Sequence, residues 1–434
     1  TLNQEGGRVV AYVKGAPRDM LDLCSHLLVD EKAVELTPAL ARQVAEQIDR
    51  YAADGLRVLA VACRQVTEPR DRWSAETVER DLTLLGLVAM MDPPRPEVAE
   101  AVEVARSAGI RSVMVTGDYG LTAESIARRI GMIQSGQPRI ITGAELGRMP
   151  DSELRFALQR EDVIFARVAP EQKMRIVEAF KELGDVVAVT GDGVNDAPAL
   201  KRADIGVAMG IAGTEVAKEA ADLILTDDNF ASIVAAIEQG RAVYDNIKKF
   251  LSYFITANAA ELVPYLSMVL FGLPLPLTVL QLLAIDLGAE QLPALALGTE
   301  PPEPGIMRRP PSAQRRPILD RGVLSRGYFY LGAIAALAGM TGYYFAYWSS
   351  GWRPGEPLPD SGPVYALATT MTFAGIVAAQ MGNAYASRTS RVSVFAIGLF
   401  GNRLLNVGVV VAIAFTALLI YLPPLQPIFN TAPL

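Results

Sequence analysis

Residues 186–200, with the sequence VVAVTGDGVNDAPAL, decide the fold that we expect for this chain. Apolar residues lead into Thr190-Gly191-Asp192-Gly193, a pattern that predicts a buried parallel strand ending in a glycine-rich turn. Open α/β sheets place their ligand sites beyond the carboxyl ends of such strands. Asp192 and Asp196 are therefore candidate oxygen ligands for a hard cation. The simpler alternative is a strand-to-helix turn capped by an Asp.

Short apolar runs alternate with helical patterns around this stretch, which predicts a parallel, doubly wound sheet. We expect further strands at 110–116 and 163–166, and helices at 122–130 and 171–183. The string at 186–200 resembles the hinge motif of P-type cation pumps, whose phosphorylation domain has the haloacid-dehalogenase fold. Thr116, Lys173 and Asp192, each beside an expected strand, resemble the remaining motifs of that Rossmann-like α/β fold.

The resemblance implies phosphoryl transfer through an aspartyl phosphate. This chemistry needs a nucleophilic carboxylate, donors for the phosphoryl oxygens, a fixed cation and acids that hold Mg²⁺. By this resemblance Thr116 and Gly117 would hold the phosphoryl oxygens (the phosphoryl cradle). Lys173 would be the fixed cation, and Asp192 would be the Mg²⁺ ligand. The full set that the resemblance implies is Thr116, Gly117, Asp118, Lys173, Asp192, Asn195 and Asp196, the last two supporting the loop.

The nucleophile of this family lies in a DKTGT string before the nucleotide-binding domain, and that string does not occur in this sequence. The TGES loop of the actuator domain and the first four membrane spans are also absent. We therefore expect a fragment that lacks the amino-terminal part of a pump, and that neither autophosphorylates nor transports ions alone.

The first 85 residues contain two strings that resemble nucleotide-domain motifs of P-type pumps. Lys14 and Gly15 belong to KGAP, which follows an apolar strand pattern, and Arg57 belongs to DGLRVLA. A lysine at a strand end is more often only a solvated charge. The resemblance implies that Lys14 and Gly15 lie beside the adenine of ATP, that Arg57 reaches its phosphates, and that Arg167 also contacts the nucleotide.

Charge divides the chain near Phe250. The 184 residues after it contain ten Arg, eight acids and no Lys, so a soluble part precedes a membrane part. The net charge of −7 gives no sign of nucleic-acid binding. Cys24 and Cys63 are widely spaced and indicate reduced cytosolic thiols. We expect a partial α+β nucleotide-binding domain at 1–85, the phosphorylation domain at 86–235 and an all-α transmembrane bundle at 236–434.

Five apolar segments in the last domain are each near the ~20 residues that a helix needs to cross a bilayer. They lie at 254–271, 275–297, 328–348, 364–387 and 404–422. Arginines are concentrated in the loops 299–326 and 388–403, which the positive-inside rule assigns to the cytosol. We therefore expect a multi-pass protein, of the plasma membrane, with its soluble domains in the cytosol. The segment 301–311 is expected to be only a linker.

Acids within the first two spans are candidate cation ligands, because ionisable groups at this depth are costly. Asn258 and Glu261 share a helix face by their spacing, as do Asp286 and Glu290. Pro264 and Pro293 cannot donate backbone hydrogen bonds, so each frees a carbonyl oxygen beside an acid. Together these groups would form an oxygen-rich cage. The simpler alternative is that the acids pair with stray polar groups and fix helix packing.

The same positions resemble the ion sites of type-2 P-type pumps. ANAAELVP resembles calcium pumps, whereas Asp286 and Gln380 resemble the sodium/potassium pump. The sequence leaves Ca²⁺, Na⁺ and K⁺ as candidates for the transported ion and favours a monovalent ion. We thus expect ATP-driven cation transport with Mg²⁺ and ATP as cofactors. The alternatives are a non-pumping membrane protein with an inert phosphatase-like domain, and a membrane-tethered phosphatase, for which a suitable nucleophilic Asp before Thr116 is missing.

Overall fold

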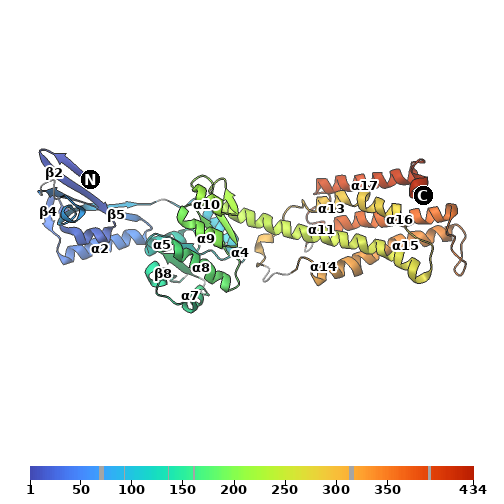
Figure 1. Cartoon of the computed structure of the whole chain (residues 1–434), viewed down its shortest axis with the longest axis horizontal. Coiled ribbons are helices and arrows are strands. Elements are labelled where there is room, and N and C mark those ends of the chain that lie inside the picture. Colours follow the sequence, from blue (N-terminus) through green and yellow to red (C-terminus); the bar gives the residue numbers. More distant parts are fainter. Residues whose placement is uncertain (68–72, 92, 135, 160–161, 312–316, 390–391) are drawn as a thin grey trace. The chain divides into compact units, whose positions relative to one another are not determined.

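The computed structural model describes the chain except residues 68–72, 92, 135, 160–161, 312–316 and 390–391. The chain forms two compact units, Thr1–Val234 and Ala235–Leu434. Within the described residues the first unit contains three sheets, and the second unit is entirely helical. Figure 1 shows the elements in sequence colours.

The amino-terminal sheet is mixed, with the strand order β1-β2-β5-β6-β3-β4. Its core forms where Met20 packs on Ala60, Ala62, Leu82 and Leu84, all on one face of the sheet. Helix α2 begins after Thr37, whose hydroxyl accepts the Leu40 N–H, and has Pro38 at its first position. The elements are β1 Leu2–Glu5, β2 Arg8–Gly15, α1 Pro17–Leu23, β3 Cys24–Val29, β4 Lys32–Glu35, α2 Pro38–Ala53, β5 Arg57–Val66, α3 Ala75–Val78 and β6 Leu82–Met90.

Two parallel three-stranded sheets follow, with the orders β7-β9-β8 and β10-β11-β12. All four residues of β9 are buried, as expected for a central parallel strand. The elements are α4 Glu97–Ser107, β7 Met114–Val115, α5 Gly120–Arg129, β8 Arg139–Thr142, α6 Gly143–Leu146, α7 Asp151–Leu158, β9 Val163–Ala166, α8 Pro170–Glu182, β10 Ala188–Gly191, η2 Val194–Asp196, α9 Ala197–Arg202, β11 Ile205–Met209, α10 Glu215–Ala220 and β12 Leu223–Leu225.

Three expectations for this region need correction. The single doubly wound sheet is divided in two, because β7 pairs only with β9 and β10 only with β11 among the described strands. The strand expected at 110–116 is reduced to β7, since its earlier residues find no partner strand. The key strand begins at Ala188 rather than Val186, whose side chain is 81% exposed.

The second unit contains helices that match the five expected spans. Five helical segments are long and apolar enough to cross a membrane: Phe230–Phe271, Val279–Leu297, Arg321–Ser349, Gly362–Ala386 and Arg403–Tyr421, as found in the part of the chain that the structure describes. α11 (Phe230–Phe271) is one continuous helix that begins within the last residues of the first unit (Figure 1). α15 (Gly332–Ser349) packs along α16 (Gly362–Ala386).

The second segment is not a uniform α-helix. α12 (Val279–Ala284) passes into a π-helical turn, η3 (Ile285–Ala289), before α13 (Gln291–Leu297). The remaining elements are η4 Ile306–Arg308, α14 Arg321–Ser325, η5 Arg326–Leu331, α17 Arg403–Tyr421 and α18 Gln426–Phe429. π-Helical turns often occur at functional sites, and this one contains Asp286.

Candidate functional sites

The loop after β10 is organised by Asp196. Its carboxylate accepts a hydrogen bond from Lys173 Nζ at 2.6 Å and is 8% exposed. The other carboxylate oxygen accepts the backbone N–H groups of Asp192 and Gly193, at 3.3 and 3.2 Å. A Cβ at Gly191 would collide with the Asp196 side chain, so only glycine allows this close approach. Asp196 therefore joins α8 to the turn that presents Asp192.

The pKa of Asp196 is lowered. Burial acts in the opposite direction and disfavours the ionised form, but the hydrogen bond from Lys173 and those from the Gly193 and Asp192 backbone outweigh it. The carboxylate is thus held ionised beside a cation. This arrangement leaves Lys173 as a fixed, partly exposed positive charge at the edge of the loop.

Asp192 is exposed, and its backbone carbonyl accepts the Thr214 N–H at 2.8 Å. The main chain is therefore anchored while the carboxylate is accessible to a ligand. Among the described residues, no group of three or more His, Cys, Asp or Glu side chains is placed to hold a metal ion. A single carboxylate still fits Mg²⁺, which commonly takes one or two protein carboxylates together with substrate phosphate oxygens.

The turn after β7 contains Thr116 and Gly117, the residues expected to hold the phosphoryl oxygens. Thr116 donates its N–H to Phe165, and its hydroxyl accepts the Asp118 N–H at 3.0 Å. The loop after β9 is joined to it by two backbone hydrogen bonds, from Arg167 to Asp118 and from Val168 to Thr116. Gly117 has open space around it, which leaves room for a ligand near its backbone.

Arg167 has a left-handed backbone conformation, with φ of 52°. Such a conformation is unfavourable for a residue with a side chain and often occurs at functional sites. The guanidinium lies over the ring of Tyr119, 5.3 Å from its centroid. Tyr119 could not be singled out from the sequence, because a tyrosine in a turn has no distinctive spacing.

Lys14 and Arg57 share one face of the amino-terminal sheet. Lys14 on β2 is paired with Val61 on β5, so their side chains lie on the same face of the sheet. Every second residue of a strand points to the same face, so Arg57, four positions before Val61, lies on that face as well. Both cations are exposed. They lie about four residues apart along the strands, or about 13 Å. Leu59 lies between Arg57 and Val61 on the same side and offers an apolar surface between the two charges.

Three carboxyl groups in the helical unit interact electrostatically, although in the described structure they are not close enough together to form a ready-made metal site. Glu261 on α11 and Asp286 in η3 both interact electrostatically with Glu290, which follows η3. The π-helical turn is visible in the hydrogen bond from the Glu290 N–H to the Ile285 carbonyl, five residues back. The Asp286 carbonyl accepts the Gln291 side chain at 2.8 Å. α17 stabilises this turn, because Phe415 fills the space where a Cβ on Gly288 would lie.

Polar atoms in this cluster lack partners although they are buried. Oε1 of Glu261 and both carboxylate oxygens of Glu290 have no hydrogen bond among the described residues, and the same holds for Nε2 of Gln380. The Glu290 and Gln380 side chains are 0% exposed. Buried polar groups are normally satisfied, so such a concentration of unpaired atoms indicates a place for a ligand.

Asn258 does not join this cluster, because it is exposed whereas Glu261 is buried. In contrast, three residues that the sequence did not single out have buried, unpaired hydroxyls in the described structure, namely Ser252, Tyr253 and Tyr265. Tyr265 follows Glu261 by one helical turn, and this spacing could have identified it.

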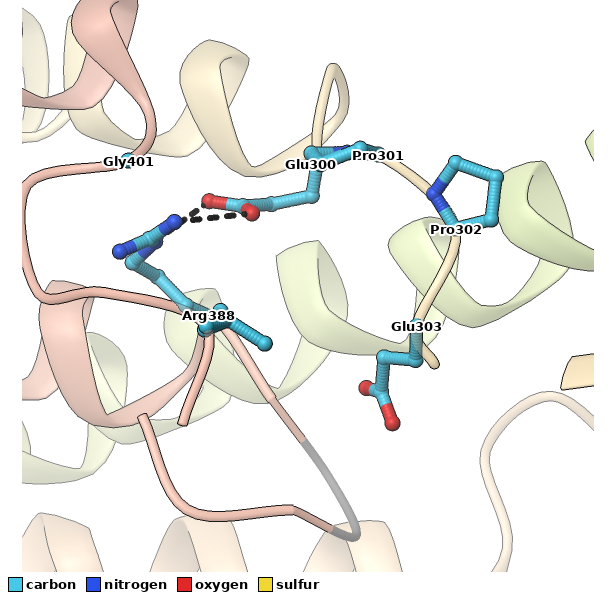
Figure 2. A pocket seen from close by; sticks show the side chains of 7 residues that line it. Glu300, Pro301, Pro302, Glu303, Arg388 and Gly401 are labelled. Carbon is cyan, nitrogen blue, oxygen red and sulfur yellow. Dashed lines mark hydrogen bonds and ion pairs between the residues drawn. The ribbon is translucent and has the colours of Figure 1, made fainter. Parts of the chain in front are cut away.

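The segment expected to be only a linker is a buried ionic network instead. Glu303 is paired with Lys249 of α11 at 3.3 Å and with Arg309 at 3.1 Å. The preceding Glu300 pairs with Arg388, next to a cavity of about 150 Å³ (Figure 2). The linker prediction missed these ion pairs because Lys249 and Arg388 are distant in sequence from Glu303 and Glu300.

Comparisons with known families cover most of the chain. Residues 1–97 match the P-type ATPase cytoplasmic domain N, residues 175–237 match the haloacid dehalogenase-like hydrolases, and residues 274–434 match the carboxyl-terminal region of cation-transporting ATPases. The second match confirms the predicted haloacid-dehalogenase-like fold class, and the long apolar helices agree with the predicted transmembrane bundle.

Individual relatives agree with these families. The chain is 41% identical to a calcium-transporting ATPase of Bacillus subtilis, over 99% of this chain and 46% of the relative. It is 38% identical to the endoplasmic reticulum calcium ATPase srcA of Aspergillus fumigatus, over 97% of this chain and 46% of the relative. It is 36% identical to the sodium/potassium-transporting ATPase subunit alpha-B of Artemia franciscana, over 100% of this chain and 48% of the relative. The chain thus spans about half the length of these curated relatives.

Proposed function

The chain belongs to the P-type cation-transporting ATPases, and on this premise we propose that the full-length protein uses ATP to move a cation out of the cytosol through an aspartyl phosphate. In this proposal the first unit binds ATP and Mg²⁺ and transfers the phosphoryl group. The helical unit binds the cation within the membrane. The proposed domain limits remain 1–85, 86–235 and 236–434.

The proposed phosphoryl site combines the turns after β7 and β10. Thr116 and Gly117 hold the phosphoryl oxygens, Lys173 offsets their charge, and Asp192 holds Mg²⁺, which neutralises phosphate charge when bound. Asn195 and Asp196 maintain the loop, and Asp118 belongs to the same set. Lys14, Gly15, Arg57 and Arg167 hold the nucleotide.

The nucleophilic aspartate is proposed to lie outside residues 1–434. Both β7 and β10 have one edge without a partner strand in the described part of the chain, and such an edge can accept another strand. A strand that carries the nucleophile and pairs there would bring it to the ends of β7 and β10, beside Thr116 and Asp192.

The observation that carries the transport proposal is the set of unpaired, buried oxygens on Glu261 and Glu290. In a membrane-spanning bundle, uncompensated acids are costly, and a bound cation would compensate them. Asp286 and Gln380 are proposed to complete the site. Asn258 is proposed to join it only if spans outside this chain cover its exposed position on α11.

Ca²⁺ is the first candidate for the cargo. Three carboxyl groups suit a divalent ion, and the relatives from Bacillus and Aspergillus are named for calcium. A monovalent ion, which the sequence motifs favour, is the second candidate. Gln380 supports a monovalent ion, because it places a neutral amide rather than a fourth carboxylate on α16. The Artemia relative, which is named for sodium and potassium, supports it as well.

Location in a membrane follows from five helices of suitable length and composition. We place the first unit in the cytosol and propose the plasma membrane. The Aspergillus relative, in contrast, is named for the endoplasmic reticulum, so fractionation of cells that express the tagged full-length protein is the direct test.

The central experiment measures phosphoenzyme formed from labelled ATP by the full-length protein with Ca²⁺, with Na⁺ or with neither. Stimulation by micromolar Ca²⁺ would support the first candidate. Stimulation by Na⁺, with dephosphorylation on adding K⁺, would support the second. If the protein contains the DKTGT string yet forms no phosphoenzyme under any of these conditions, the inert-domain alternative is favoured.

A further inference from the structure

Three polar side chains follow one another at the end of α16, two on the helix and the third on the residue that caps it. Gln380, Asn383 and Ser387 are 0%, 6% and 3% exposed. Ser387 Oγ donates to Asn383 Oδ1 at 3.1 Å, and Asn383 Nδ2 donates to Gln380 Oε1 at 3.0 Å. The hydrogen bonds therefore form a relay that ends at the proposed cation site.

The last group of the relay has no partner. Gln380 Nε2 is buried and makes no hydrogen bond within the described residues. α16 packs against both η3 and α13, the segments that flank Glu290, whose two carboxylate oxygens are also unpaired. Gln380 thus presents an N–H donor in a region that contains carboxylate acceptors.

The two orientations of each amide have the same shape. The terminal torsion of Gln or Asn is roughly two-fold, so the oxygen and nitrogen can exchange places without moving the backbone. If both amides turn over, Gln380 Nε2 donates to Asn383 Oδ1, Asn383 Nδ2 donates to Ser387 Oγ, and Gln380 Oε1 becomes the presented group. The Ser387 hydroxyl can then donate to the backbone carbonyl one turn back.

We propose that Asn383 and Ser387 are positioning residues that set which group Gln380 presents to the transported cation. This inference rests on the proposed transport function. With no cation bound, the N–H of Gln380 faces the region of the carboxyl groups. With a cation bound, the reversed relay presents the Gln380 oxygen as a ligand. Asn383 is essential to both states because it both donates and accepts.

Two substitutions separate these roles. Asn383→Leu removes the donor and the acceptor, so Gln380 loses one hydrogen bond both with and without the cation, and the two losses largely cancel in the affinity. Asn383→Asp can only accept, so it holds the Gln380 oxygen toward the site. Loss of one hydrogen bond of this kind corresponds to about a five- to tenfold change in affinity. Thr372→Val is a matched control, because Thr372 is also buried on α16 and, within the described residues, its hydroxyl donates to the Ala368 carbonyl of its own helix.

The experiment measures, in the full-length protein, the cation concentration that gives half-maximal phosphoenzyme, and separately the maximal phosphoenzyme level. We expect Asn383→Leu to change the half-maximal concentration by less than about twofold, and Asn383→Asp to lower it about five- to tenfold. Maximal levels should stay near wild type in both. Thr372→Val should change neither quantity.

A double-mutant cycle removes the effect of the added charge. In a Gln380→Leu background, Asn383→Asp should no longer tighten cation binding, since no amide remains to be oriented. If Asn383→Asp tightens binding equally there, or if Asn383→Leu tightens binding as much as Asn383→Asp does, the relay is wrong. Lack of any cation-dependent phosphoenzyme in the wild type would instead overturn the proposed transport function.

Discussion

Arg388 and Glu300 form an ion pair with their nearest atoms 2.7 Å apart, and both side chains are almost fully buried, at 2% and 1% exposed. Figure 2 shows the two side chains pointing toward each other from different loops. Asn402 also donates to Glu300, at 2.8 Å, and Arg388 donates to the carbonyls of Gly398 and Leu399. The pair therefore joins the loop after α13 to the loop between α16 and α17.

Removal of one member of this pair should be much more damaging than removal of both. Glu300→Leu leaves Arg388 buried without its counter-charge, which we expect to destabilise the protein by about 3–5 kcal/mol. Glu300→Leu combined with Arg388→Met should be less destabilising than the sum of the single variants. Thermal unfolding of the detergent-solubilised protein measures the effect.

The control is Glu124→Gln, which breaks the more exposed pair with Arg128. It should lower the free energy of unfolding by less than about 1 kcal/mol. Equal losses for the two Glu variants would contradict this role.

Stability should depend on the ionisation of Asp196. Its pKa in the folded protein is below the unfolded value, so the ionised carboxylate stabilises the fold above about pH 4, near the ordinary pKa of Asp. This stabilisation is lost as the pH falls through the folded pKa. Unfolding of the full chain measured from pH 6 to pH 3 should show a smaller acid-induced loss in Asp196→Asn than in wild type. Identical pH profiles would show that the Lys173–Asp196 contact contributes nothing.

Asp192→Asn should abolish Mg²⁺-dependent phosphoenzyme in the full-length protein without unfolding it. The side chain is exposed, whereas the loop is anchored by the Asp192 backbone and by Asp196, so the fold should be unaffected. We expect phosphoenzyme to fall about 10²-fold or more, as for loss of other electrostatic groups at reacting centres. Asp185→Asn, at an exposed acid outside the loop, is the control. A normal phosphoenzyme level in Asp192→Asn would refute its role as the Mg²⁺ ligand.

Gly288→Ala should disturb the cation site through α17. The added methyl group would collide with the Phe415 ring, so η3 and α17 must separate and the Asp286 and Glu290 carboxyls must shift. Overpacking of this kind typically costs about 1–3 kcal/mol. We expect weaker cation activation of phosphoenzyme formation and partial rescue by Phe415→Leu in the double variant. Gly382→Ala, where a Cβ meets open space on α16, should be near neutral. Failure of the second substitution to rescue would contradict the steric explanation.

Local patterns were enough to predict much of the fold. The helices expected at 122–130 and 171–183 occur as Gly120–Arg129 and Pro170–Glu182, and each apolar segment of the second unit is helical. The glycine-rich turn at 190–193 also follows a strand, as predicted. These features depend on contacts within a few residues, on proline and glycine geometry, and on runs of apolar side chains, all of which are visible in the sequence.

Only the tertiary structure decided which distant side chains meet. Lys173 and Asp196 are held together because α8 packs against α9 and η2 after β10, and Glu300 meets Arg388 across 88 positions of sequence. The same holds for Glu261 and Glu290, and for the outward position of Asn258. Helical spacing specifies which residues share a face, but the direction of that face is set by long-range packing. The sequence by itself therefore determined the family resemblance and the candidate residues, whereas packing between distant helices decided which candidates form a site.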